Sequence, residues 1–110
     1  MKEIMKNIER AKVLALREQI AYQDGQIVSK TLVQNGAVSM TLFSFERGEE
    51  ISTHAAGGDA FVYCLDGTGK FTIDGVEHIL HEGDAIVMPA GHPHAVYGEE
   101  RFKMLLTVVF

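Results

Sequence analysis

The sequence predicts an all-β fold, built as a single domain from 110 residues. Two-residue turn signals of the Asp-Gly and Asn-Gly type recur along the chain, at residues 24–25, 35–36 and 74–75. Between them lie short segments rich in β-branched and aromatic residues, about nine or ten in all. Turn signals at intervals of about eight to twelve residues are typical of a β-sandwich or a closed barrel.

The first part of the chain, residues 1–41, is expected to hold an N-terminal helix and the leading strands. Ile4, Ile8, Ala11 and Ala15 recur at helical spacing with charged residues between them, which predicts a short helix over residues 1–12. From about residue 14 the hydrophobic period shortens. Strands are therefore predicted over residues 19–23 and 26–34, separated by the Asp-Gly turn.

The second part, residues 42–110, is expected to form the core of the same domain. A strand over 38–46 leads into it and is followed by a strand over 59–65, which a turn at 66–67 ends. A hairpin pairs 70–73 with 76–80, and further strands cover 85–88 and 95–97. The last segment, residues 103–110, is almost continuously apolar, which suits a strand buried on both faces.

Composition excludes several classes of partner. The 15 acidic and 10 basic side chains give a formal charge of −5 with no stripe of Lys and Arg, so nucleic acid is not expected as a partner. No apolar run approaches the roughly 20 residues that cross a bilayer, so no membrane partner is expected. Cys64 is the only cysteine, which rules out an intrachain disulfide and favours the cytoplasm.

Two histidine-bearing stretches carry the most specific pattern. The first stretch contains Gly48, His54 and Gly67, and the second contains Gly83, Pro89, Gly91 and His94. These positions match both motifs of the cupins, and the chain from about residue 42 to 109 resembles that family. The resemblance implies a jelly-roll barrel, or double-stranded β-helix, here with a short N-terminal helix.

In cupins that hold a metal, two histidines and a glutamate of the first motif bind it with the histidine of the second. His54 and His94 occupy two of these four positions, and Ala56 and Ala60 stand at the other two. His92 precedes a proline, which favours an extended backbone and would point it to the same side as His94. His92 is therefore the best third ligand, unless it lies on an exposed turn. Imidazole ligands suit Fe, Ni, Zn or Cu.

Strand parity predicts a small, mostly apolar pocket beside the histidines, lined by Met40, Ala60, Val62, Ile73, Val87 and Tyr97. Three functions remain open for such a pocket. The first is a small-molecule-binding protein with a degenerate two-histidine metal site. The second is a metal-dependent enzyme of dioxygenase or isomerase type, and the third is a non-catalytic sensor or structural protein with an empty barrel.

A homodimer is also expected. The C-terminal strand is apolar on both faces, and the N-terminal stretch adds apolar residues that a barrel of this size does not fully bury. Soluble proteins avoid an apolar patch or an unpaired edge of that kind, and a two-fold interface would cover it. The alternative is that the N-terminal helix covers the patch within one subunit.

Overall fold

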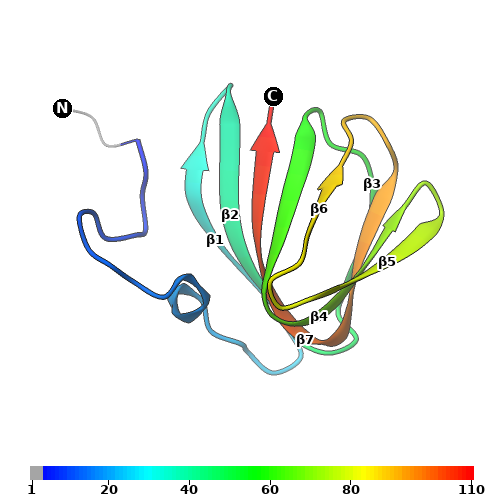
Figure 1. Cartoon of the computed structure of the whole chain (residues 1–110), viewed down its shortest axis with the longest axis horizontal. Coiled ribbons are helices and arrows are strands. Elements are labelled where there is room, and N and C mark those ends of the chain that lie inside the picture. Colours follow the sequence, from blue (N-terminus) through cyan, green and yellow to red (C-terminus); the bar gives the residue numbers. More distant parts are fainter. Residues whose placement is uncertain (1–3) are drawn as a thin grey trace.

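The structure, a computed structural model, describes residues 4–110, and its regular secondary structure is almost all strand (Figure 1). A single 3₁₀ turn, η1 (Leu16–Gln19), precedes them. The strands of the described residues are β1 (Ile27–Gln34), β2 (Val38–Phe45), β3 (Glu50–His54), β4 (Asp59–Ile73), β5 (Val76–His81), β6 (Ala85–Met88) and β7 (His94–Val109). The all-β fold class is confirmed.

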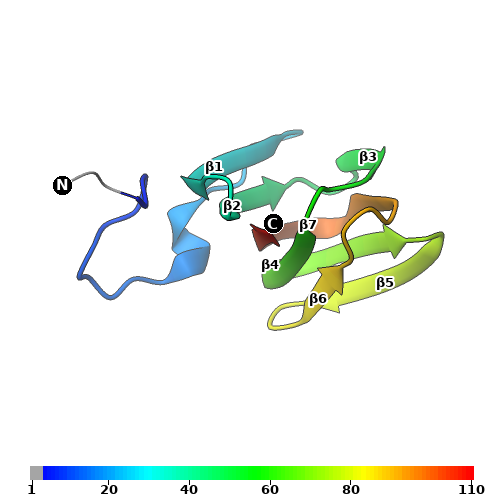
Figure 2. The same ribbon diagram turned by 90° about the horizontal axis from the view of Figure 1, so that it is seen from above.

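Two long strands, β4 and β7, carry the sheet from one layer into the other. The C-terminal half of β7 pairs with β2 and with the first part of β4, whose other edge pairs with β6. The N-terminal half of β7 pairs with β3 and with the last part of β4, whose other edge pairs with β5. All these pairings are antiparallel, and the result is the two-layered jelly roll seen from above in Figure 2.

The sequence predicts more strands than form because it divides β4 and β7 in two. Asp66-Gly67 does not end a strand. The pairing of β4 with β7 instead shifts register on both sides of Gly67, which lies at the corner between the layers with φ of 74°. A register shift of this kind bends a strand without ending it.

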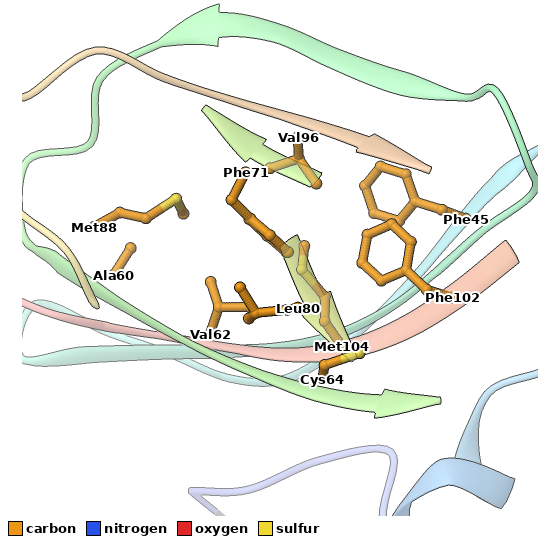
Figure 3. Packing of buried hydrophobic residues seen from close by; sticks show 10 residues of the cluster. All are labelled: Phe45, Ala60, Val62, Cys64, Phe71, Leu80, Met88, Val96, Phe102 and Met104. Atoms are coloured by element: carbon orange, nitrogen blue, oxygen red, sulfur yellow. The ribbon is translucent and has the colours of Figure 1, made fainter. Parts of the chain in front are cut away.

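The main core lies between the two layers and combines side chains from both (Figure 3). Phe45 and Phe102 stack with ring centroids 4.6 Å apart, and Phe71 meets Phe102 edge to face at 5.9 Å. Residues at every second strand position complete it: Ala60, Val62, Cys64, Leu80, Met88, Val96 and Met104. This period of two is the expected consequence of strands that present one face to the core.

A second apolar cluster covers part of the outer face of the first layer. Ile20, Leu32, Leu42 and Leu65 are its buried members. Residues 16–22, which we call the strap, run across this face, and Leu16 packs on the cluster. The strap lies where a strand over 19–23 was predicted. That strand is absent. The backbone carbonyls of Arg17, Gln19 and Ala21 accept hydrogen bonds from side chains of the sheet and not from the amides of a neighbouring strand.

The predicted helix over residues 1–12 is wrong for residues 4–12, and residues 1–3 lie outside the described part of the chain. Asn7 and Ala11 have φ of 61° and 53°, which a right-handed α-helix does not accommodate. A helix of about 12 residues is marginal in water unless packing stabilises it. The helical turn that does form is η1, further along the chain.

No helix within residues 4–110 is long and apolar enough to cross a membrane.

Candidate functional site

The sheet register brings the two motif histidines together at one end of the barrel. His54 is the last residue of β3 and His94 the first residue of β7, and the two are directly paired in the antiparallel ladder. Their Nε2 atoms lie 3.1 Å apart, and their rings meet at 70° with centroids 4.3 Å apart. We call these two residues the histidine pair.

The two rings differ in exposure. The side chain of His94 is buried, with 3% of the residue exposed, whereas His54 is open to solvent. Burial lowers the pKa of the His94 imidazole, and the neighbouring His54 ring acts in the same direction. His94 is therefore neutral at pH 7, and a neutral imidazole has one nitrogen that donates and one that accepts.

Hydrogen bonds around the pair fix which nitrogen carries each proton. Nδ1 of His54 lies 3.0 Å from the carbonyl oxygen of Ser52, which can only accept. His54 therefore donates from Nδ1, and its Nε2 accepts in the neutral ring. His94 then donates from Nε2 to His54. Nδ1 of His94 keeps the lone pair and is buried with no hydrogen-bond partner of good geometry among the described residues. The backbone carbonyl of His92 lies beside the ring and opposes the lowering of its pKa.

His92 does not join the pair, which corrects its prediction as a third metal ligand. Its Nδ1 lies 2.6 Å from Oδ2 of Asp74, and both side chains are half exposed. This pair spans the turn between β4 and β5 and the turn before β7. The parity argument placed His92 on an extended segment, but the residues before β7 form a turn in which the His92 amide donates to the Pro89 carbonyl.

The donor set falls short of a metal site. Two Nε2 atoms 3.1 Å apart suit adjacent ligands at ~2.0–2.1 Å from one ion, but a catalytic zinc site has about three protein ligands. Residues 4–110 contain no group of three or more His, Cys, Asp or Glu side chains that could hold a metal. Asp59 accepts a hydrogen bond from the Ala90 amide, and Ala56 and Ala60 offer no ligand. The residues present do not fit a resident metal ion.

The predicted pocket residues separate into two groups. Ala60 and Val62 are buried in the main core, and Ile73 packs against it beside His94. The prediction is wrong in orientation for Met40, Val87 and Tyr97. Met40 packs on the outer cluster, Val87 is half exposed between the inward-facing Ile86 and Met88, and Tyr97 lies on the opposite face of β7 from the buried Val96. Within β7 the buried His94 and Val96 share one face, so Tyr97 lies on the other.

Two hollows of the surface lie away from the histidine pair. One, of about 500 Å³, lies at the turn after β2 and has mixed charge, with Glu46, Arg47 and Arg101 among its lining residues. The other, of about 350 Å³, lies between the strap and β4. Neither hollow is lined by His54 or His94, so the accessible part of the candidate site is the exposed ring of His54.

Sequence reasoning missed two residues that shape this site. Ser52 sets the tautomer of His54 through its backbone carbonyl, which no side-chain pattern reveals. Asp74 was interpreted only as a turn residue, yet its carboxylate holds His92. The Asp74 amide also donates to the Pro93 carbonyl. The sequence does show that Asp74 places a carboxylate in the turn directly after the strand that carries Ile73.

Comparisons with known proteins agree with this architecture. A family model described as a Cupin domain matches residues 41–110. A conserved protein of unknown function from Streptococcus pyogenes is 45% identical, with a TM-score of 0.95 over 98% of this chain and 95% of its own. A cupin superfamily protein from Desulfitobacterium hafniense is 32% identical, with a TM-score of 0.92 over 98% of this chain and 99% of its own.

A cupin 2 conserved barrel domain protein from Leptotrichia buccalis is 47% identical, with a TM-score of 0.84. The similarity covers 86% of this chain but 46% of that protein. No curated protein matches the chain significantly.

Proposed function

The chain belongs to the cupin family, and on that premise we propose that it is a small-molecule-binding protein whose ligand contacts the histidine pair. One observation carries the proposal: strands β3 and β7 bring the Nε2 atoms of His54 and His94 to 3.1 Å at one end of the barrel. A buried histidine whose Nδ1 has no partner costs stability, which favours a functional reason for its presence.

The ligand is proposed to bind at the mouth of the barrel. The interior beneath the pair holds closely packed side chains such as Met88 and Phe71, both less than 3% exposed (Figure 3). The ring of His54 is exposed, and the partly buried Ile51 and Ile73 lie beside the pair on β3 and β4. An apolar body with one polar group would match these surroundings.

A fragment screen followed by NMR tests the proposal. We expect fragments that bind to shift the ring C–H signals of both His54 and His94. His94→Gln should abolish the shift of the remaining His54 signal and leave the fold intact, because the turn before β7 is held by backbone hydrogen bonds. His81→Gln, on the exposed end of β5, is the matched control and should bind as the wild type does. Fragments that perturb only the Glu46–Arg101 hollow would contradict the proposal.

We also propose that the protein is a homodimer, joined through the part of the outer sheet face that the strap leaves open. Phe61 and Val87 are cross-strand neighbours on β4 and β6 and are 43% and 50% exposed, with Tyr63 next to them at 39%. The strap covers Leu42 and Leu65 on the same face and lines a hollow together with Tyr63, but it leaves Phe61 and Val87 exposed. A second copy that presents the same patch would cover it by two-fold symmetry.

Sedimentation equilibrium at micromolar concentration tests the dimer. The wild type should sediment as two chains, and Phe61→Lys should shift the mass toward one chain because it places a charge at the centre of an apolar contact. Val76→Lys is the control, since Val76 is 58% exposed at the turn between β4 and β5, away from the patch. A wild-type mass of one chain at every concentration would remove the proposal.

A further inference from the structure

We propose that the histidine pair works without a metal and recognises a hydroxyl group, which takes the place of the direct contact between the two Nε2 atoms. The proposal deepens the proposed function, because it names the ligand chemistry of that same site. It depends on the tautomers of the two rings, on the lack of further metal ligands among the described residues, and on the difference in exposure between the two rings.

The tautomers leave the pair with one donor and one acceptor facing each other. Because Nδ1 of the neutral His54 ring donates a hydrogen bond to the Ser52 carbonyl, Nε2 of His54 presents a lone pair. Nε2 of His94 presents the proton, at a nitrogen-to-nitrogen distance of 3.1 Å. A ligand group that replaces this contact has to accept from His94 and donate to His54. A hydroxyl group does both, whereas a carboxylate or an ether oxygen only accepts.

A metal would require a different proton arrangement. An ion bound to both Nε2 atoms moves the proton of His94 to Nδ1, which is buried and has no well-placed acceptor among the described residues. Histidines that bind metals almost always donate their other ring N–H to a carboxylate, a carbonyl or water. His54 has such an acceptor in Ser52, whereas the acceptor beside the His94 ring, the backbone carbonyl of His92, makes no hydrogen bond of good geometry with Nδ1. The contact of 3.1 Å between the two Nε2 atoms thus carries the assignment of the His94 N–H to Nε2.

Nearby groups that could complete a metal site have other partners. His92 is paired with Asp74 at 2.6 Å, and the Asp59 carboxylate accepts from the Ala90 amide at 2.9 Å. Ala60 is 1% exposed and packs in the core with Met88, so its position has neither a ligand atom nor an open space toward the pair. An ion at the pair would have two protein ligands from the described residues.

The exposed ring gives a hydroxyl group room to enter. His54 ends β3 at the mouth of the barrel and is exposed, whereas His94 is buried, so a ligand would reach the contact between the two Nε2 atoms from the side of His54. Ile73 is the cross-strand neighbour of His94, and Ile51 lies on β3 before His54. These apolar neighbours suit a hydroxyl carried on an apolar body, as in phenol.

Phenol and anisole form the matched pair of probes, since anisole has the same ring and an oxygen that cannot donate. We expect phenol to shift the ring signals of His54 and His94 in the full-length protein, and anisole to leave them unchanged. Long-range ¹H–¹⁵N spectra should show the proton on Nδ1 of His54 and on Nε2 of His94. Equal shifts with anisole, no shift with phenol, or a His94 ring protonated on Nδ1 would each overturn the proposal.

Titration with Zn²⁺, Ni²⁺ and Cu²⁺, each as the metal alone, tests the metal-free state. We expect uptake far below one equivalent and unchanged ring signals of the pair. One equivalent of metal that is lost in His94→Gln and kept in His92→Asn would overturn the proposal. The proposed function is contradicted by a different result, namely that no small molecule of any class shifts the ring signals of the pair. Binding of molecules that can only accept hydrogen bonds would remove the hydroxyl specificity alone.

Discussion

Removing residues 1–22 should leave a chain that does not fold, whereas removing residues 1–14 should leave a folded barrel. Of the residues that the shorter deletion takes away, those that the structure describes, 4–14, are mostly exposed, including Val13 at 99%. The longer deletion also removes the strap, which covers Leu32, Leu42 and Leu65. Exposing a buried leucine costs roughly 1.5–3 kcal/mol. Three such losses are comparable with a whole-domain stability of about 5–15 kcal/mol.

The strap is held by polar contacts as well as by apolar burial. Lys103 Nζ donates to the Arg17 carbonyl at 2.7 Å, Lys30 Nζ to the Gln19 carbonyl at 3.0 Å, and Ser44 Oγ to the Ala21 carbonyl at 2.8 Å. Lys103 and Ser44 are buried beneath the strap.

Tyr22 anchors the end of the strap and supplies a graded variant. Its hydroxyl donates to Oδ2 of Asp66 at 2.6 Å, and the Arg101 guanidinium lies over its ring at 4.1 Å. Tyr22→Phe keeps the ring and loses the hydrogen bond, which costs about 1.5–3 kcal/mol when the partner is charged. Urea unfolding should give Tyr22→Phe a lower midpoint than the wild type, and the 1–22 deletion should show no cooperative transition. A 1–22 deletion as stable as the wild type would show that the strap is dispensable.

Local turn chemistry explains why much of the fold could be predicted. Asp74-Gly75 forms a two-residue hairpin turn with φ of 50° and 80°, and Ile73 pairs with Val76 on either side of it. Asn35 accepts from the amides of Ala37 and Val38, which sets the hairpin between β1 and β2. These signals are short-range, so one sequence reveals them.

Long-range contacts explain what could not be predicted. The continuity of β4 depends on its pairing with β7 about 40 residues later, and the sequence around Gly67 taken alone indicates a turn. The helix expected at the N-terminus fails for a related reason. Its apolar residues Met5 and Ile8 pack on the outer cluster from a non-helical backbone, and that cluster exists only once the sheet has formed.

The candidate site likewise has a part that the sequence predicts and a part that it does not. Motif spacing identified His54 and His94, whose meeting depends on the register of β3 against β7. The sequence could not predict that His92 pairs with Asp74, because the two residues lie in different turns. The prediction for Val87 and Tyr97 placed each of them on the inner face, whereas their strand neighbours Met88 and Val96 occupy that face.

Gly67→Ala should be the most damaging single methyl group that can be added to this chain, and Gly91→Ala provides its matched control. The two glycines have nearly the same backbone conformation, with φ of 74° and 76°. The left-handed region costs a residue with a Cβ about 1–2 kcal/mol. That cost applies equally to both variants, so any further difference comes from the surroundings of the added carbon.

The added carbon would have free space at Gly91 but would meet backbone atoms at Gly67. A Cβ on Gly91 would meet nothing within 4 Å, whereas a Cβ on Gly67 would overlap the carbonyl oxygen of Arg101 and approach Cα of Phe102 at 2.8 Å. Both obstacles belong to the backbone of β7 at the corner between the two layers, so neither can move aside without breaking the pairing of β4 with β7. We expect Gly91→Ala to lose about 1–2 kcal/mol in urea unfolding, and Gly67→Ala to lose more than about 4 kcal/mol or to be insoluble. Equal losses in the two variants would mean that the conformational cost alone accounts for both, and that the corner can open to accept a side chain.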